Sequence, residues 1–105
     1  MLNSFSGIGR LGSDPELRNI DGNMKAEFHI NINEFFKNRD GELDRKKHWI
    51  PCQTHGRLAD IVGEFLRKGS QVGIRGSLVR TDENNLCVDV KELEFLSSAK
   101  TSETP

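Results

Sequence analysis

The chain has 105 residues, a length that supports one domain with a modest core. Hydrophobic residues make up 34% and charged residues 30% of it, so we expect a folded domain with a strongly polar surface, and no stretch approaches the roughly 20 apolar residues of a membrane span. The formal net charge of −1 does not by itself indicate a nucleic-acid binder, because such binding depends on a local positive stripe rather than on the sum.

Glycines interrupt the first predicted strand, residues 3–11 (NSFSGIGRL). Residues 7–12 (GIGRLG) fit the G-x-G-x-x-G pattern of a dinucleotide-binding loop, which requires a helix after the glycine turn. The segment that follows predicts turns instead, with Asp14 and Pro15 as the cap and first residue of a single helical turn before Gly22. We therefore reject nucleotide binding and expect the glycines to let the first strand bend.

Residues 25–33 (KAEFHININ) show the clearest strand pattern, with alternating apolar and polar side chains. The apolar face consists of Ala26, Phe28, Ile30 and Ile32. A charged stretch with a turn signal at Asp40 and Gly41 follows, which predicts a long hairpin returning into a third strand, residues 48–55.

In the third strand, alternate residues face the core and the outside. The inner face consists of Ile50, Cys52 and Thr54, and the outer face of Trp49, Pro51, Gln53 and His55. Because proline lacks the N–H of the ladder, Pro51 predicts an edge position or a bulge.

Residues 56–69 (GRLADIVGEFLRKG) predict a helix with Arg67 and Lys68 in its last turn and Gly69 at its end. Its expected buried stripe is Leu58, Ile61, Val62, Phe65 and Leu66. Gly63 within it indicates close packing.

Two further strands are predicted, residues 71–80 and 86–95, joined by a short turn. In the first of them, Val72 and Ile74 alternate inward. In the second, we expect Leu86, Val88 and Val90 to point inward and a bulge near Glu92.

No catalytic or metal-binding signature is found in the sequence. Cys52 and Cys87 lack a CxxC spacing and the neighbours of a zinc site, so we interpret them as reduced packing residues. No nucleophile–base pair or meaningful pair of carboxylates is present. We expect no enzymatic activity, no cofactor and no metal.

The order strand, strand, strand, helix, strand, strand is that of the OB-fold. The predicted fold class is therefore all-β with one helix, a five-stranded Greek-key barrel with the helix between strands 3 and 4. We expect residues 1–97 to form this domain and residues 98–105, which carry no large apolar side chain, to form a disordered tail.

Residues 9–18 (GRLGSDPELR), residues 56–78 (GRLADIVGEFLRKGSQVGIRGSL) and the lone Trp49 resemble the bacterial single-stranded DNA-binding protein family. The resemblance runs from about residue 2 to residue 96. It implies an OB-fold that binds single-stranded DNA independently of sequence, in replication, recombination or repair, by base stacking and phosphate neutralisation. It also implies a cytoplasmic homo-oligomer, tetramer or dimer, with no membrane contact and with replication or repair proteins as further partners.

The resemblance places Trp49 and Phe36 on stacking positions of the family and His55 where the family often has an aromatic residue. Arg57 and Lys68 fall on basic positions flanking the helix. The full predicted DNA-binding set is Trp49, Phe36, His55, Phe35, Arg10, Lys37, Arg39, Lys47, Arg57, Lys68, Arg75 and Arg80. For Trp49 the alternative is packing beneath the hairpin or in a subunit contact.

A second hypothesis is an OB-fold interaction module derived from this family, of the primosomal replication-restart type. Its main partner would be another replication protein. The short predicted turn between the last two strands and the near-neutral charge favour this alternative.

Overall fold

A computed structural model describes residues 1–97 of the chain. Its elements are β1 (Phe5–Leu11), β2 (Glu16–Ile20), β3 (Asn23–Lys37), β4 (Leu43–His55), α1 (Arg57–Phe65), β5 (Gln71–Arg80) and β6 (Leu86–Ser97). The disordered tail predicted for residues 98–105 lies outside the described residues. Without β2, the order of elements is the one predicted from the sequence.

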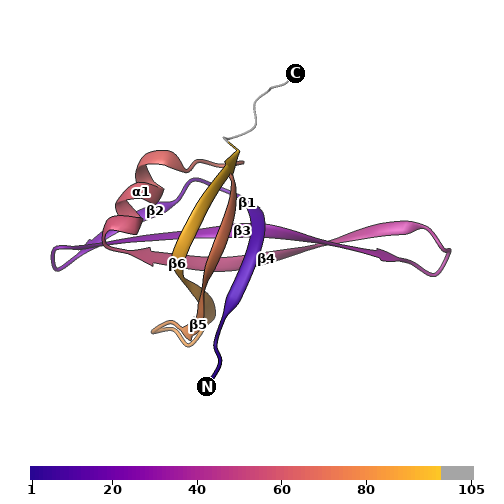
Figure 1. Ribbon diagram of the computed structural model, residues 1–105, viewed down its shortest axis with the longest axis horizontal. Coiled ribbons are helices and arrows are strands. Elements are labelled where there is room, and N and C mark those ends of the chain that lie inside the picture. Colours follow the sequence, from indigo (N-terminus) through magenta and orange to yellow (C-terminus); the bar gives the residue numbers. More distant parts are fainter. Residues whose placement is uncertain (98–105) are drawn as a thin grey trace.

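Five strands close into a ring, which confirms the predicted OB-fold. The antiparallel pairs β3–β4, β1–β5 and β5–β6 are long, and β1 turns from β5 to pair with β3 at Arg10 and Leu11. A short parallel pairing of β4 with β6 at Cys52 and Gln53 completes the ring. Figure 1 shows β3 and β4 running the length of the molecule, with β1, β5 and β6 crossing them and α1 beside β2.

The helical turn predicted after Asp14 is wrong, because Glu16–Ile20 form strand β2. This strand pairs with the first residues of β3, from Glu16 opposite Glu27 to Ile20 opposite Asn23. A two-residue turn with positive φ at Asp21 and Gly22 joins them, a geometry typical of tight hairpins. The free edge that β3 offers here stabilises the extended form.

Helix α1 is shorter than predicted and ends at Phe65, so Arg67 and Lys68 follow the helix rather than occupying its last turn. The guanidinium of Arg67 nevertheless donates hydrogen bonds to the carbonyls of Gly63 and Leu66, which the helix end leaves without partners. Gly63 is closely packed as predicted, because a Cβ there would lie 2.6 Å from Cδ1 of Leu17 on β2.

The core lies inside the ring and beneath α1, and it confirms most predicted inward positions. Its buried members include Ala26, Phe28, Ile30, Cys52, Thr54, Val62, Leu66, Val72, Ile74, Val88 and Val90. Two predictions were wrong: Phe65 and Leu86 are exposed by 61% and 51%. Phe65 is the last residue of α1, and its ring packs edge-on against Phe95 at the surface, with the ring centroids 5.9 Å apart. Leu86 is the first residue of β6.

The irregular positions of the sheet agree with the sequence. Gly76 pairs with Val90 and Arg75 with Glu92, which leaves Lys91 as the extra residue of a bulge next to the predicted position. Pro51 pairs with β3, and the pairing of β4 with β6 starts only at Cys52. Pro51 therefore occupies an edge, where its missing N–H costs no ladder bond. Within residues 1–97, no helix has the length and hydropathy to cross a bilayer.

Candidate nucleic-acid interface

The hairpin of β3 and β4 extends beyond the barrel as an arm, residues 33–47 (Figure 1). Its tip is an ordered turn in which the side-chain oxygen of Asn38 accepts from the backbone N–H groups of Asp40 and Glu42 at 2.9 and 3.1 Å. Gly41 has φ 77°, which confirms the predicted turn at Asp40 and Gly41. The register along the arm is therefore set by its tip.

The register separates the charges of the arm onto its two sides. Residues directly opposite each other in an antiparallel pair share a side, and the side alternates along the strand. On the side of Trp49 lie the pairs Asn31–Trp49, Asn33–Lys47, Phe35–Arg45 and Lys37–Leu43. On the opposite side lie Ile32–His48, Glu34–Lys46 and Phe36–Asp44.

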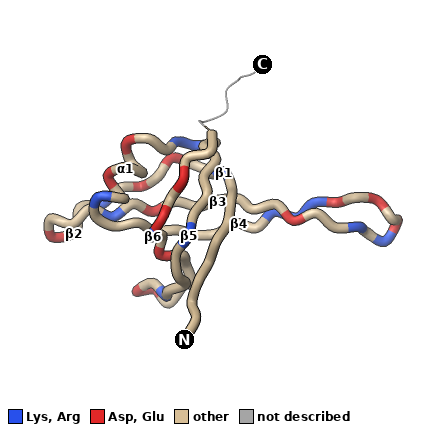
Figure 2. Tube along the Cα trace, in the orientation of Figure 1, with Lys and Arg blue, Asp and Glu red and all other residues tan. Residues whose placement is uncertain are grey.

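The Trp49 side of the arm thus carries three cations and no acid. Figure 2 shows blue and red segments mixed along the arm, so the separation follows from the register rather than from the chain trace. On the opposite side, Glu34 lies 2.8 Å from the imidazole of His48 and faces Lys46 across the strands. A near-neutral arm therefore has one purely basic side, which we call the basic side: Lys37, Arg45 and Lys47.

The aromatic side chains near the arm are accessible. Trp49 is 51% exposed, Phe35 60% and Phe36 40%. Trp49 is therefore not sealed in the interior of its own domain. Phe35 lies on the basic side with Trp49, and Phe36 lies on the opposite side with Asp44. Trp49 and Phe35 therefore share one side of the arm with its cations, separated by the pair Asn33–Lys47.

Arg10 joins this surface from β1. The cross-strand neighbours Gln71, Arg10, Asn31 and Trp49 form one row across β5, β1, β3 and β4. The guanidinium of Arg10 donates a hydrogen bond of 2.8 Å to the carbonyl of Gly69, which holds it at the barrel surface. Arg10 is exposed and lies at the base of the arm, where it extends the positive charge toward the barrel.

His55 lies on the same side of β4 as Trp49 but at the far end of the strand. Its Nε2 is 3.5 Å from Asp89, a mostly buried carboxylate that also pairs with Lys91 at 2.8 Å and with Gln53 at 3.4 Å. The ring is therefore engaged at its edge, although half of its surface is exposed. Arg57, at the start of α1, follows it two residues later.

Between β2 and the β5–β6 hairpin lies a cleft of about 360 Å³ over the outer face of β3 and β4. OB-folds commonly bind their ligands over this face, between the equivalent loops. Four of its lining residues are acidic, Asp14, Glu16, Glu27 and Glu83, and its one arginine, Arg18, is paired with Glu27 at 3.1 Å. The potential of the cleft opposes a phosphate chain, so the basic side of the arm is the better track.

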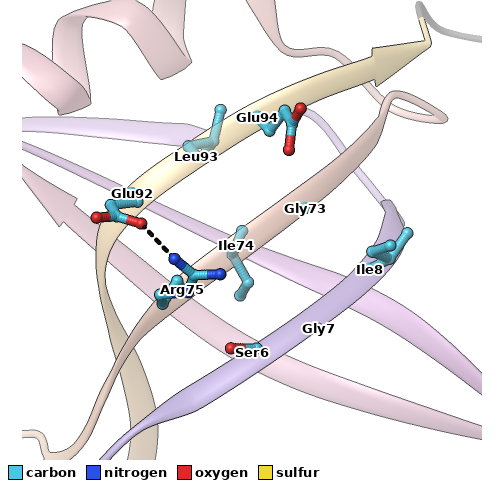
Figure 3. A pocket seen from close by; sticks show the side chains of 9 residues that line it. All are labelled: Ser6, Gly7, Ile8, Gly73, Ile74, Arg75, Glu92, Leu93 and Glu94. Atoms are coloured by element: carbon cyan, nitrogen blue, oxygen red, sulfur yellow. Dashed lines mark hydrogen bonds and ion pairs between the residues drawn. The ribbon is translucent and has the colours of Figure 1, made fainter.

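The structure does not bring the remaining predicted residues to this surface. Arg39 lies at the tip of the arm, and Lys68, which follows α1, donates its backbone N–H to Asp14. Arg80 bonds the carbonyl of Asn84 within the β5–β6 hairpin. Arg75 lines an open groove over β1, β5 and β6, where it pairs with Glu92 at 3.0 Å (Figure 3).

Arg45 is the cation that the predicted set missed. It belongs to the charged stretch around the turn at Asp40 and Gly41, but only its pairing with Phe35 shows that it shares a side with Trp49. Counting outward from the turn at Asp40 and Gly41 could have found it, because the turn sets the register of both strands.

The cysteines are packing residues in this structure. Both are free and buried, and burial raises the pKa of each thiol, that of Cys52 to about 12. Reactive thiols have lowered pKa values, so these side chains are poor nucleophiles. Among residues 1–97, no group of three or more His, Cys, Asp or Glu side chains is placed to hold a metal ion.

Comparison with known proteins gives a consistent result. Residues 2–95 match the profile of the "Single-strand binding protein family". "Single-stranded DNA-binding protein 1" of Xylella fastidiosa is 39% identical over 79 residues, covering 73% of this chain. The protein of the same name from Chlorobaculum tepidum is 38% identical over 92 residues, covering 86% of this chain. The chain spans 58% and 57% of the length of these two relatives.

A solved structure described as "Plasmodium falciparum SSB complex with ssDNA" has the same fold. It superposes with a TM-score of 0.80 at 28% sequence identity, over 92% of this chain and 97% of that one. The ring of strands is therefore shared almost completely.

Proposed function

Because this chain belongs to the single-strand binding protein family, we propose that it binds single-stranded DNA independently of sequence and without a catalytic step. Replication, recombination and repair are the processes in which such a strand is exposed. The relatives that match are named for DNA binding, which favours this function over the interaction-module alternative.

The observation that carries the proposal is the pairing of exposed rings with cations on one side of the arm. Trp49 and Phe35 are exposed and share this side of the arm with Lys37, Arg45 and Lys47. Every base has a flat face, so stacking tolerates any sequence and contributes about 1–3 kcal/mol per base. The cations neutralise the phosphates that connect the stacked bases.

We propose a path for the strand that starts on the basic side of the arm and passes Trp49 toward Arg10. It then avoids the acidic cleft between β2 and the β5–β6 hairpin, because Glu16 and Glu83 repel phosphate there. Of the predicted residues, Phe36 lies on the opposite side of the arm, and His55 and Arg57 lie at the far end of β4, so the proposed path does not include them.

Two further properties are proposed with the function. A homo-oligomer, dimer or tetramer, would place several arms around one strand, and multi-angle light scattering after size exclusion measures its mass. Location in the cytoplasm, together with replication or repair proteins as partners, follows from a role on exposed DNA.

The test is a titration of fluorescein-labelled oligo-dT, followed by fluorescence anisotropy at several NaCl concentrations. We expect binding at low salt that weakens as salt rises. Trp49→Ala should weaken it by about 5- to 150-fold, the equivalent of one lost stacked base. The matched control is Phe65→Ala, which removes another exposed aromatic ring, on α1 and away from the arm. Absence of binding at low salt would refute the proposal.

A further inference from the structure

Gly12 follows β1 directly and its backbone is held from two directions. Its N–H donates to the carbonyl of His29 on β3 at 3.2 Å. The preceding residue, Leu11, exchanges hydrogen bonds with the Gly69–Ser70 segment, at 2.9 and 3.0 Å. The position of the Gly12 backbone is therefore set by the barrel closure and not by a mobile loop.

The indole of Trp49 lies against this glycine. A Cβ placed on Gly12 would be 2.5 Å from Cζ3 and 2.8 Å from Cη2 of the indole, closer than real atoms approach. Trp49 belongs to β4, and β4 and β1 pair with opposite edges of β3. Neighbouring strands are about 4.8 Å apart, so the ring spans the outer face of β3 to reach Gly12.

The residue beneath this span supports the same arrangement. Asn31 of β3 is directly opposite Trp49, and its Oδ1 is buried without a hydrogen-bond partner among the described residues. The residue Trp49 nevertheless remains 51% exposed. An indole with one face against the barrel and the other open to solvent accounts for both observations.

We propose that Gly12 is the positioning residue of Trp49: its lack of a side chain lets the indole lie flat across β3, with one face presented to a base. That the open face of the indole binds a base rests on the proposed function. The contact between Gly12 and the indole does not, because a spectroscopic measurement on the free protein detects it.

The backbone of Gly12 makes this proposal testable. Its φ is not in the left-handed region, so alanine fits the main chain without strain. Gly12→Ala should therefore leave the backbone unchanged and displace the indole of Trp49, which must tilt or shift to clear the new methyl group. Gly73→Ala is the matched control, because a Cβ there meets its nearest neighbour at 3.7 Å, an ordinary contact.

The first measurement uses the fluorescence of Trp49, the single tryptophan of the chain. In the free protein, Gly12→Ala should shift the emission maximum and change the rate of acrylamide quenching, and Gly73→Ala should change neither. Unaltered emission and quenching in a folded Gly12→Ala variant would overturn the proposal.

The second measurement is the affinity for labelled oligo-dT. Gly12→Ala should weaken binding by about three- to tenfold, since the tilted ring keeps part of its stacking. The salt dependence should stay unchanged, since no phosphate contact is lost. A changed salt slope would indicate a displaced arm and would contradict a positioning role.

A double substitution separates positioning from general damage. Phenylalanine lacks the second ring, so Gly12→Ala should have no further effect on affinity or thermal stability in a Trp49→Phe background. An equal loss in both backgrounds would overturn the proposal, and so would a Gly12→Ala variant that stays unfolded with Phe at position 49. If Trp49→Ala leaves DNA binding intact, the proposed stacking of a base on Trp49 is wrong. The fluorescence of the Gly12→Ala variant still shows whether Gly12 positions the indole.

Discussion

Lys46 and Lys47 are neighbours in the chain and lie on opposite sides of the arm, which gives a sharp test of the basic side. Lys47 is opposite Asn33, and this pair lies next to the pair Asn31–Trp49 on the same side of the arm. Lys46 is opposite Glu34 on the other side. Substituting either by alanine changes the net charge equally. A difference between the two variants therefore reports the side of the arm and not the charge of the protein.

The magnitude follows from the number of phosphates contacted. For single strands, each neutralised phosphate contributes about 0.7 to the slope of log K against log salt. Between 1 M and 0.1 M NaCl, one such contact changes the affinity by about fivefold. Lys47→Ala should therefore lower the slope by about 0.7 and weaken binding at 0.1 M about fivefold relative to the unsubstituted chain.

The assay measures the quenching of Trp49 fluorescence by oligo-dT at 0.05–0.4 M NaCl. Both lysine variants retain Trp49, so the same signal reports on each. Lys46→Ala should leave the slope unchanged, and adding Arg45→Ala to Lys47→Ala should lower it by about 0.7 again. If Lys46→Ala and Lys47→Ala lower the slope equally, the two sides of the arm are not distinct and the proposed track is wrong.

Three further outcomes are expected. His55→Phe should change the affinity for oligo-dT by less than about twofold, because His55 lies at the far end of β4, beyond the acidic cleft that the proposed path avoids; a complex tighter by about tenfold would show that the strand reaches and stacks on this end of β4. Leu66→Ala should cost about 2–5 kcal/mol in urea unfolding, because Leu66 is 1% exposed, and Phe65→Ala about 1 kcal/mol or less; equal losses would refute the position of the helix end. Burial holds the pKa of Cys52 near 12, so above pH 9, where the unfolded thiol ionises, the free energy of unfolding should fall by up to about 1.4 kcal/mol per pH unit. Urea unfolding between pH 8 and 10.5 should show this fall, which Cys52→Ala reduces; a decline unaffected by that substitution would contradict it.

Local patterns predicted most of the barrel. Alternation over β3 and β4 placed Phe28 and Cys52 inside and Trp49 outside, because side chains of a strand point alternately to its two faces. The apolar stripe of the helix predicted for residues 56–69 placed Val62 and Leu66 inside, and both are buried. The pattern failed at two terminal residues, Phe65 at the end of α1 and Leu86 at the start of β6, which are both exposed. Phe65 packs against Phe95 at the surface instead of entering the core, a contact that the helical pattern alone does not predict.

Strand β2 shows a different limit. The segment around Pro15 has local features of a helical turn, and its extended form depends on the edge of β3 that is available only after folding. The same holds for Gly12, whose neighbour Trp49 is 37 positions away in the chain. Neither spacing nor composition predicts a contact that three strands must first assemble.

The sequence by itself determined which residue types exist near the site: a lone tryptophan on an outer strand face, two phenylalanines and a mixed run of charges around a turn. Only the tertiary structure decided that Lys37, Arg45 and Lys47 share the side of Trp49, that acids line the neighbouring cleft, and that a glycine lies beneath the indole. The physical reason is that alternation is a local property of one strand, whereas register and barrel closure are set by pairing between strands distant in the chain.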